Sequence, residues 1–136
     1  MNTQKLLIGT VAGGITLFAA GYIIYMWLFG NANIGMEPSA DGIMMDNIKI
    51  PTIILMELVY GLLLSLILIW KGSGNFSSGL STGALVGLLI GLTFGLDLFS
   101  TTSLVNFNYV LFSAVTYAVR YGLAGGVIAL VIRSKS

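Results

Sequence analysis

The sequence predicts an all-α membrane protein in which four transmembrane helices form an antiparallel bundle. The 136-residue chain is 57% hydrophobic and 8% charged, with a mean hydropathy of +0.98. A soluble domain carries about 25% charged residues, so this composition cannot cover a water-exposed surface. The chain also contains four separate apolar stretches, each close to the roughly 20 residues that cross a hydrocarbon core. We therefore predict a single four-helix transmembrane domain over residues 1–136, surrounded by the lipid bilayer.

The first two helices are expected at about residues 6–29 and 51–70. The first stretch continues into Tyr22, Tyr25 and Trp27, and such aromatic residues are typical of a helix end at the membrane interface. The connection after it, residues 30–50, is the longest polar segment of the chain.

The third helix, expected at about residues 80–99, has glycine at every fourth position. In water each interior glycine would cost a helix about 1 kcal/mol, whereas in a bilayer the backbone must bond to itself. Spacing of four places the glycines in one groove, which another helix can approach closely. We predict glycine-zipper packing for this helix, with the other segments packed against it and with Ser77 and Ser78 as its cap. Its glycines are Gly79, Gly83, Gly87, Gly91 and Gly95.

The fourth helix, expected at about residues 109–132, follows a short connection and should lie antiparallel beside the third. It carries small residues at spacing four: Ala114, Ala118, Gly122 and Gly126. Two such rows allow close packing within one bundle. They also allow a seam between copies of the chain or a sliding interface in a transporter, and the sequence leaves these interpretations open.

The basic residues predict the orientation. Lys5, Lys71, Arg133 and Lys135 flank the expected helices on one side, whereas Glu37, Asp41 and Asp46 lie in the connection on the other side. The positive-inside rule makes the basic side cytoplasmic. Both termini are therefore expected in the cytoplasm.

Three ionisable residues lie within the apolar stretches: Glu57, Asp97 and Arg120. A charge at the centre of a membrane costs about 2.5–3.5 kcal/mol on insertion scales, which favours pairing. A rise of 1.5 Å per residue places Glu57 about 9 Å below the outer end of its helix and Arg120 about 17 Å below Tyr109. Because Arg120 should lean outward, towards the depth of Glu57, we predict an ion pair between them. Asp97 is the second candidate partner.

Polar residues gather around this pair at helical spacing. Ser113, Thr116 and Tyr117 share a face with Arg120, and Tyr60 lies one turn from Glu57. This set is either a structural salt bridge with surrounding hydroxyl groups or an ion- or ligand-binding site at the centre of the bundle.

Several chemistries are excluded. The chain has no cysteine and no histidine, which excludes thiolate nucleophiles, disulfides and the usual zinc and haem ligation. No catalytic triad or phosphate loop is present. We expect no enzyme activity, no cofactor and no metal, and the net charge of +1 argues against a nucleic-acid partner.

Three short motifs carry a resemblance: Gly21-Tyr22 with Leu28-Phe29-Gly30, the segment from Thr101 to Phe107, and Tyr117 with the segment from Gly125 to Leu130. With them the chain resembles a family of small bacterial four-helix membrane proteins that has no established function. The resemblance implies a four-helix fold in a bacterial inner membrane. It transfers no site residue.

Three functions remain open from the sequence. The leading hypothesis is a non-catalytic helical bundle that acts as a homo-oligomer or as an accessory subunit of a membrane complex. The alternative is a small transporter or channel with a polar site around Glu57 and Arg120, although a carboxylate paired with arginine is a poor proton carrier. The third is binding of a lipid or small apolar ligand between the helices.

Overall fold

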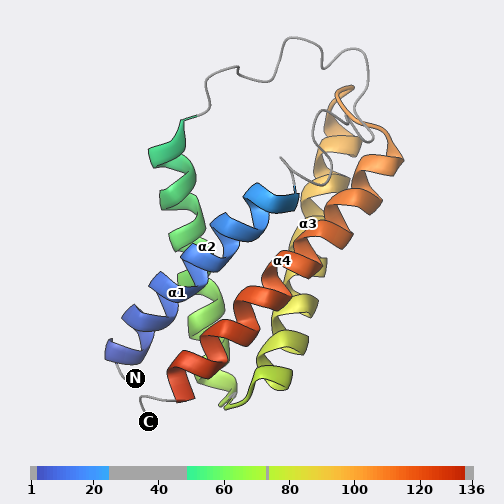
Figure 1. Cartoon of the computed structure of the whole chain (residues 1–136). Coiled ribbons are helices and arrows are strands. Elements are labelled where there is room, and N and C mark those ends of the chain that lie inside the picture. Colours follow the sequence, from blue (N-terminus) through green and yellow to red (C-terminus); the bar gives the residue numbers. More distant parts are fainter. Residues whose placement is uncertain (1–2, 25–48, 73, 134–136) are drawn as a thin grey trace.

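A computed structural model of the chain describes residues 3–24, 49–72 and 74–133, and in this part it is all-α (Figure 1). The helices are α1 (Thr3–Tyr22), α2 (Ile50–Lys71), α3 (Phe76–Thr101) and α4 (Phe107–Arg133). Each is long and apolar enough to cross a membrane, as the sequence predicts. Helix α1 begins and α4 ends at the same end of the molecule, where the α2–α3 connection also lies (Figure 1).

The helix ends differ from the expected ones at α3, which begins four residues before residue 80. Asn75 is the cap, because its Oδ1 accepts a hydrogen bond from the backbone N–H of Ser78 at 2.8 Å. The expectation that Ser77 and Ser78 cap the helix is therefore wrong, since both lie in its first turn. The asparagine side chain reaches one of the free N–H groups of this turn and so extends the helix towards the connection.

The end of α2 requires a glycine. Gly72 has a φ of 78°, in the left-handed region, and its N–H points back to the carbonyl oxygens of Leu68 and Ile69. A side chain would be strained at this φ, so glycine ends the helix and turns the chain towards α3. Residues 25–29 of the predicted first helix, with Tyr25 and Trp27, lie outside the described residues, as do Glu37, Asp41, Asp46 and Lys135.

Helix α4, rather than α3, is the helix against which the others pack. It contacts α1, α2 and α3, whereas α3 packs mainly against α4. Consistently, 56% of the apolar span of α4 is buried, compared with 22% of that of α3. The expectation that the other segments pack against the glycine-rich helix is therefore wrong. Glycines allow one close neighbour, but they present no side chains with which to contact several.

Helices α3 and α4 are in backbone contact along the glycine row. A Cβ atom added at Gly79, Gly83 or Gly87 would collide with the carbonyl oxygens of Gly125, Tyr121 and Tyr117, respectively. At Gly91 it would lie 2.5 Å from the carbonyl oxygen of Ser113, and at Gly95 it would lie 2.8 Å from the Cα of Val110. The residue numbers of the contacted α4 positions decrease as those of the α3 glycines increase. All five glycines are buried within the chain.

The predicted row of small residues on α4 lies beside this contact rather than in it. Gly122 faces Ala84 and Leu80, and Gly126 faces the ring of Phe76. The glycines of α3 instead meet the row of Ser113, Tyr117, Tyr121 and Gly125. The glycines of α3 thus meet backbone and Cβ atoms of a row that includes two tyrosines, and a search for matching small residues does not find this row.

Helices α1 and α2 cross at a second glycine contact. A Cβ added at Gly61 would lie 2.6 Å from the carbonyl oxygen of Thr10 and 2.8 Å from the backbone nitrogen of Gly14. Gly14 and Gly61 are buried at this crossing, whereas much of the outer surface of both helices is apolar and exposed. The chain is thus two closely packed helix pairs, α1–α2 and α3–α4, joined mainly by contacts of α1 and α2 with α4.

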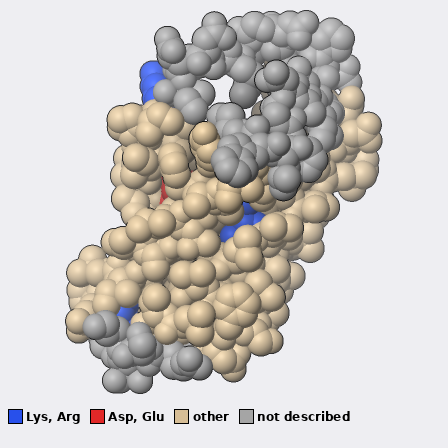
Figure 2. Space-filling view, in the orientation of Figure 1, with Lys and Arg blue, Asp and Glu red and all other residues tan. Residues whose placement is uncertain are grey.

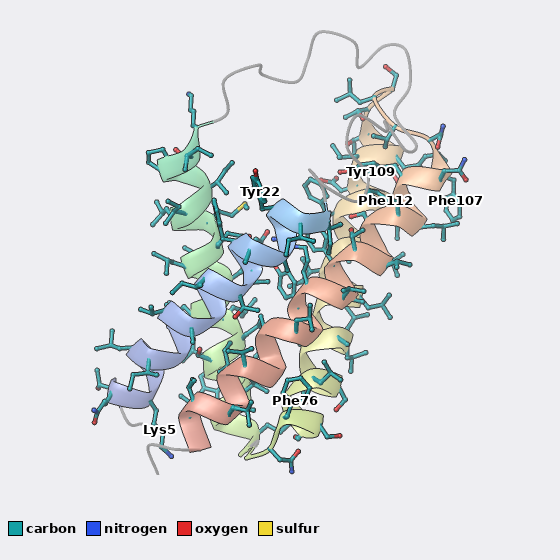
Figure 3. All side chains as sticks on the ribbon, in the orientation of Figure 1. Lys5, Tyr22, Phe76, Phe107, Tyr109 and Phe112 are labelled. Carbon is teal, nitrogen blue, oxygen red and sulfur yellow. The ribbon has the colours of Figure 1, made fainter. Side chains whose placement is uncertain are left out.

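The exterior of the described residues is apolar along the helices. In Figure 2 charged side chains occupy only small, separated patches among uncharged residues. Lys5 and Phe76 lie near one end of the molecule, and Tyr22, Phe107 and Tyr109 lie near the other (Figure 3). This distribution is typical of a membrane-spanning protein, in which aromatic residues lie near the interfaces.

Candidate functional site

The ion pair between Glu57 and Arg120 is the polar centre of the described structure. The Nη2 atom of Arg120 lies 2.7 Å from Oε2 of Glu57 and 3.0 Å from Oε1, so one nitrogen donates to both carboxylate oxygens. The two residues are only 4% and 3% exposed. Arg120 thus has the partner that the depth argument favoured, and the pair joins α2 to α4.

Helix α1 closes one side of the pair through a glycine. A Cβ at Gly21 would lie 3.5 Å from Nε of Arg120 and 3.6 Å from its Nη2, in ordinary van der Waals contact. The backbone of α1 therefore lies directly beside the guanidinium group. The sequence argument missed Gly21 as a site residue, because a glycine carries no chemical signal of its own.

Tyr117 lies on another side of the guanidinium group. The Cζ atom of Arg120 is 5.3 Å from the centroid of the Tyr117 ring, within the range of a cation–π interaction. The spacing of three residues places Tyr117 on the same face of α4 as Arg120. Its predicted place in the site is therefore correct, and its role is to present an aromatic face to the cation.

Aromatic rings extend from this point across three helices. Tyr117 stacks on Phe94 of α3 at 6.3 Å between centroids and on Tyr121 of α4 at 5.7 Å. Tyr60 of α2 meets Tyr121 edge to face at 5.3 Å. Tyr60 thus lies in the group that the sequence predicted, whereas Phe94 and Tyr121 were missed because aromatic residues on a helix are ordinarily core residues.

Two of the predicted hydroxyl residues are buried and donate to backbone carbonyl groups. Ser113 Oγ donates a hydrogen bond to the carbonyl oxygen of Gly91 at 3.1 Å, across the α3–α4 contact. Thr116 Oγ1 donates to the carbonyl oxygens of Phe112 and Ser113 on its own helix. Such bonds satisfy hydroxyl groups that have no access to water.

Asp97 lies apart from this site. Its side chain is exposed near the last turn of α3, and no salt bridge joins it to another described residue. It is therefore not the partner of Arg120, and the second pairing that the sequence allowed is wrong. A carboxylate so close to the helix end can remain at the membrane interface.

The interior beyond the ion pair is packed with apolar side chains. From the pair, α2 and α4 both run towards the end where α4 terminates, and between them lies a buried core of Leu17, Leu64, Leu68, Ala124, Ile128 and Ile132. Within this region the hydroxyl of Ser65 is fully buried and makes no hydrogen bond to the described residues. Apart from the hydroxyl groups of Ser65 and Tyr121, the buried side chains of this core are apolar.

An apolar surface groove of about 320 Å³ lies on α3 and α4, and neither Glu57 nor Arg120 lines it. It is lined by Leu80, Ala84, Ala118, Val119, Gly122 and Leu123. Three of these residues are small: Ala84, Ala118 and Gly122.

Comparison with known protein families, with curated proteins and with solved structures finds no match to this chain. The resemblance to a small bacterial membrane-protein family stays a prediction.

Proposed function

We propose that the chain is an integral membrane protein whose four helices span the bilayer as an antiparallel bundle. The length and apolar character of the helices support this, as does the position of the start of α1 and the end of α4 at one end of the molecule. Backbone contacts at the glycines of α3 support zipper packing. The basic residues near that end favour cytoplasmic termini. The proposed location in a bacterial inner membrane rests on the family resemblance.

Within this architecture we propose a non-catalytic role, as a homo-oligomer or as an accessory subunit of a larger membrane complex. The observation that carries it is the Glu57–Arg120 pair, in which each charge is buried and neutralised by the other. The polar centre is thus best explained as a cross-link between α2 and α4.

The apolar groove of α3 and α4 supports contact with another protein. Its small residues, Ala84, Ala118 and Gly122, allow a second helix to approach closely in a membrane. The five glycines of α3 do not supply this surface, because they are buried against α4.

Purification in mild detergent tests this role. We expect the protein to elute as an assembly larger than its 14.4 kDa chain, either with copies of itself or with a reproducible partner. Ala118→Leu fills the groove and should reduce the assembly. Leu111→Ala, at an exposed position elsewhere on α4, is the control and should leave it unchanged. A single chain without partner in several mild detergents would contradict the proposal.

A small transporter or channel with a polar site around Glu57 and Arg120 is the second candidate. The gathering of a carboxylate, a guanidinium group and tyrosine rings inside the helices favours it, and the apolar core beyond Ser65 weighs against it. Reconstitution in proteoliposomes distinguishes the two functions. Transport requires a substrate-linked proton flux that Glu57→Gln abolishes, whereas the subunit role requires none.

A further inference from the structure

The guanidinium group of Arg120 lies in surroundings that themselves form a cation site. The carboxylate of Glu57 accepts hydrogen bonds from it at 2.7 and 3.0 Å. The ring of Tyr117 presents its face at 5.3 Å. A carboxylate together with an aromatic face is the combination that recognises guanidinium and quaternary ammonium groups in proteins.

We propose that Glu57 and Tyr117 form a binding site for small organic cations of the guanidinium class, and that Arg120 is its tethered occupant. The chain then carries an autoinhibited cation site: an external cation binds only by displacing Arg120. This goes beyond the proposed subunit role, because it assigns a ligand class to side chains that otherwise only hold α2 and α4 together.

Neighbouring residues keep the site in shape independently of the arginine. Tyr117 stacks with Phe94 and with Tyr121, and Tyr121 is in turn in contact with Tyr60 of α2. These ring contacts join α2, α3 and α4 without involving the guanidinium group. The aromatic face should therefore remain when Arg120 is shortened.

The burial of the site strengthens its selectivity for a cation. The Glu57 side chain is 4% exposed, so water screens its charge weakly, and an unpaired carboxylate there is costly. Removal of the Arg120 guanidinium group leaves this carboxylate without its counter-ion and leaves space of matching size and shape. A free guanidinium derivative restores both the charge balance and the contact with Tyr117.

Competition with Arg120 sets the difference in cation affinity between the wild type and a variant without the guanidinium group. In the wild type an external cation binds only the fraction of molecules in which Arg120 is displaced, and its apparent affinity falls by that fraction. We expect methylguanidinium to bind Arg120→Ala at least about tenfold more tightly than the wild type.

The test measures the thermal unfolding midpoint of the full-length chain in mild detergent. The midpoint is compared between samples with low millimolar methylguanidinium chloride and samples with the same concentration of sodium chloride. Arg120→Ala should gain stability with methylguanidinium alone. Glu57→Gln/Arg120→Ala should not, because it lacks the carboxylate. Lys71→Ala, which removes an exposed cation far from the site, should respond like the wild type.

An equal gain in the double variant, or no gain in Arg120→Ala, would overturn the proposal. If Arg120→Ala does not fold alone, the yield of folded protein is measured with and without methylguanidinium. The same measurement is made on Arg120→Gln, a milder variant. Absence of rescue in both variants also counts against the site. None of these results depends on the oligomeric state, so failure of the subunit role is distinguished from failure of the cation site.

Discussion

Glu57 and Arg120 are tolerated inside an apolar helical protein because each removes the penalty of the other. An isolated charge at the centre of a membrane costs about 2.5–3.5 kcal/mol on insertion scales and more in simulations. At 2.7 Å the two charges form a charge-assisted hydrogen bond in surroundings from which water is almost absent. Loss of one partner alone leaves the other charge buried without a counter-ion, whereas loss of both leaves no such charge.

A double-mutant cycle tests this coupling. Glu57→Gln and Arg120→Gln should each lower the free energy of unfolding by about 3–5 kcal/mol, because each leaves an uncompensated buried charge. The double variant should lose less than the sum of the two. The free energy is measured by reversible unfolding in detergent or bilayers.

The control for this cycle is Asp97→Asn. This exposed carboxylate forms no salt bridge with a described residue, so its loss should change stability by no more than about 0.5 kcal/mol. Fully additive losses in the Glu57 and Arg120 variants would show that the two side chains act independently and would contradict the pairing.

At the scale of the element, α3 shows how packing outweighs helix propensity. Five interior glycines would cost a helix in water about 5 kcal/mol relative to alanine. In the folded chain each of them allows the backbone of α4 to approach to a distance that a methyl group would prevent. The stability of α3 therefore comes from its contact with α4 and not from its own sequence.

Gly87→Ala tests this dependence. The added methyl group would collide with the carbonyl oxygen of Tyr117 and lie 2.6 Å from the Cβ of Tyr121. Because backbone must move to relieve the collision, we expect a loss of about 1–3 kcal/mol in the free energy of unfolding, despite the better helix propensity of alanine.

Gly74→Ala is the matched control, since it is the same substitution in the α2–α3 connection. Nothing lies within 4 Å of the added methyl group there, and the midpoint of thermal unfolding should be unchanged. Equal effects of the two substitutions would indicate that the glycine row of α3 is not a packing surface.

At the scale of the whole molecule, the two helix pairs meet on α4. The α3–α4 pair is joined by backbone contact, and the α1–α2 pair crosses at Gly61. Between the pairs lie the ion pair, the tyrosine rings and the apolar core around Leu64 and Ile128. The site is thus located where the two halves of the molecule are held together.

The proposed orientation is testable with single cysteines, because the chain contains none of its own. Asn108→Cys lies at the start of α4 and Gly74→Cys lies in the α2–α3 connection, at opposite ends of the molecule. A membrane-impermeant maleimide should label Asn108→Cys in intact cells. Gly74→Cys should be labelled only after permeabilisation, because the proposed orientation puts that end in the cytoplasm.

The cysteine-free wild type is the control for non-specific labelling. The reverse pattern would place both termini outside the cytoplasm and would invert the proposed topology. Labelling of both cysteines in intact cells would contradict a connection and a helix start on opposite sides of the membrane.

The sequence by itself determined the class of protein and the position of each candidate span. Composition and apolar length are properties of the chain alone, and a bilayer permits only self-bonded backbone, so four helices follow without knowledge of their contacts. Depth along a helix follows from the rise per residue, which is why Arg120 could be matched with Glu57 in preference to Asp97.

Only the tertiary structure decided which faces meet. Helical spacing shows that a row of glycines is a groove, but it does not show which neighbour fills the groove. Here the neighbour is the row of Ser113, Tyr117, Tyr121 and Gly125 rather than the row of Ala114, Ala118, Gly122 and Gly126. Nor does spacing reveal that Gly21 brings a third helix against the guanidinium group. Contacts between segments far apart in the chain depend on the rotation and crossing angle of whole helices. These are set by how the helices pack together and cannot be read from one segment alone.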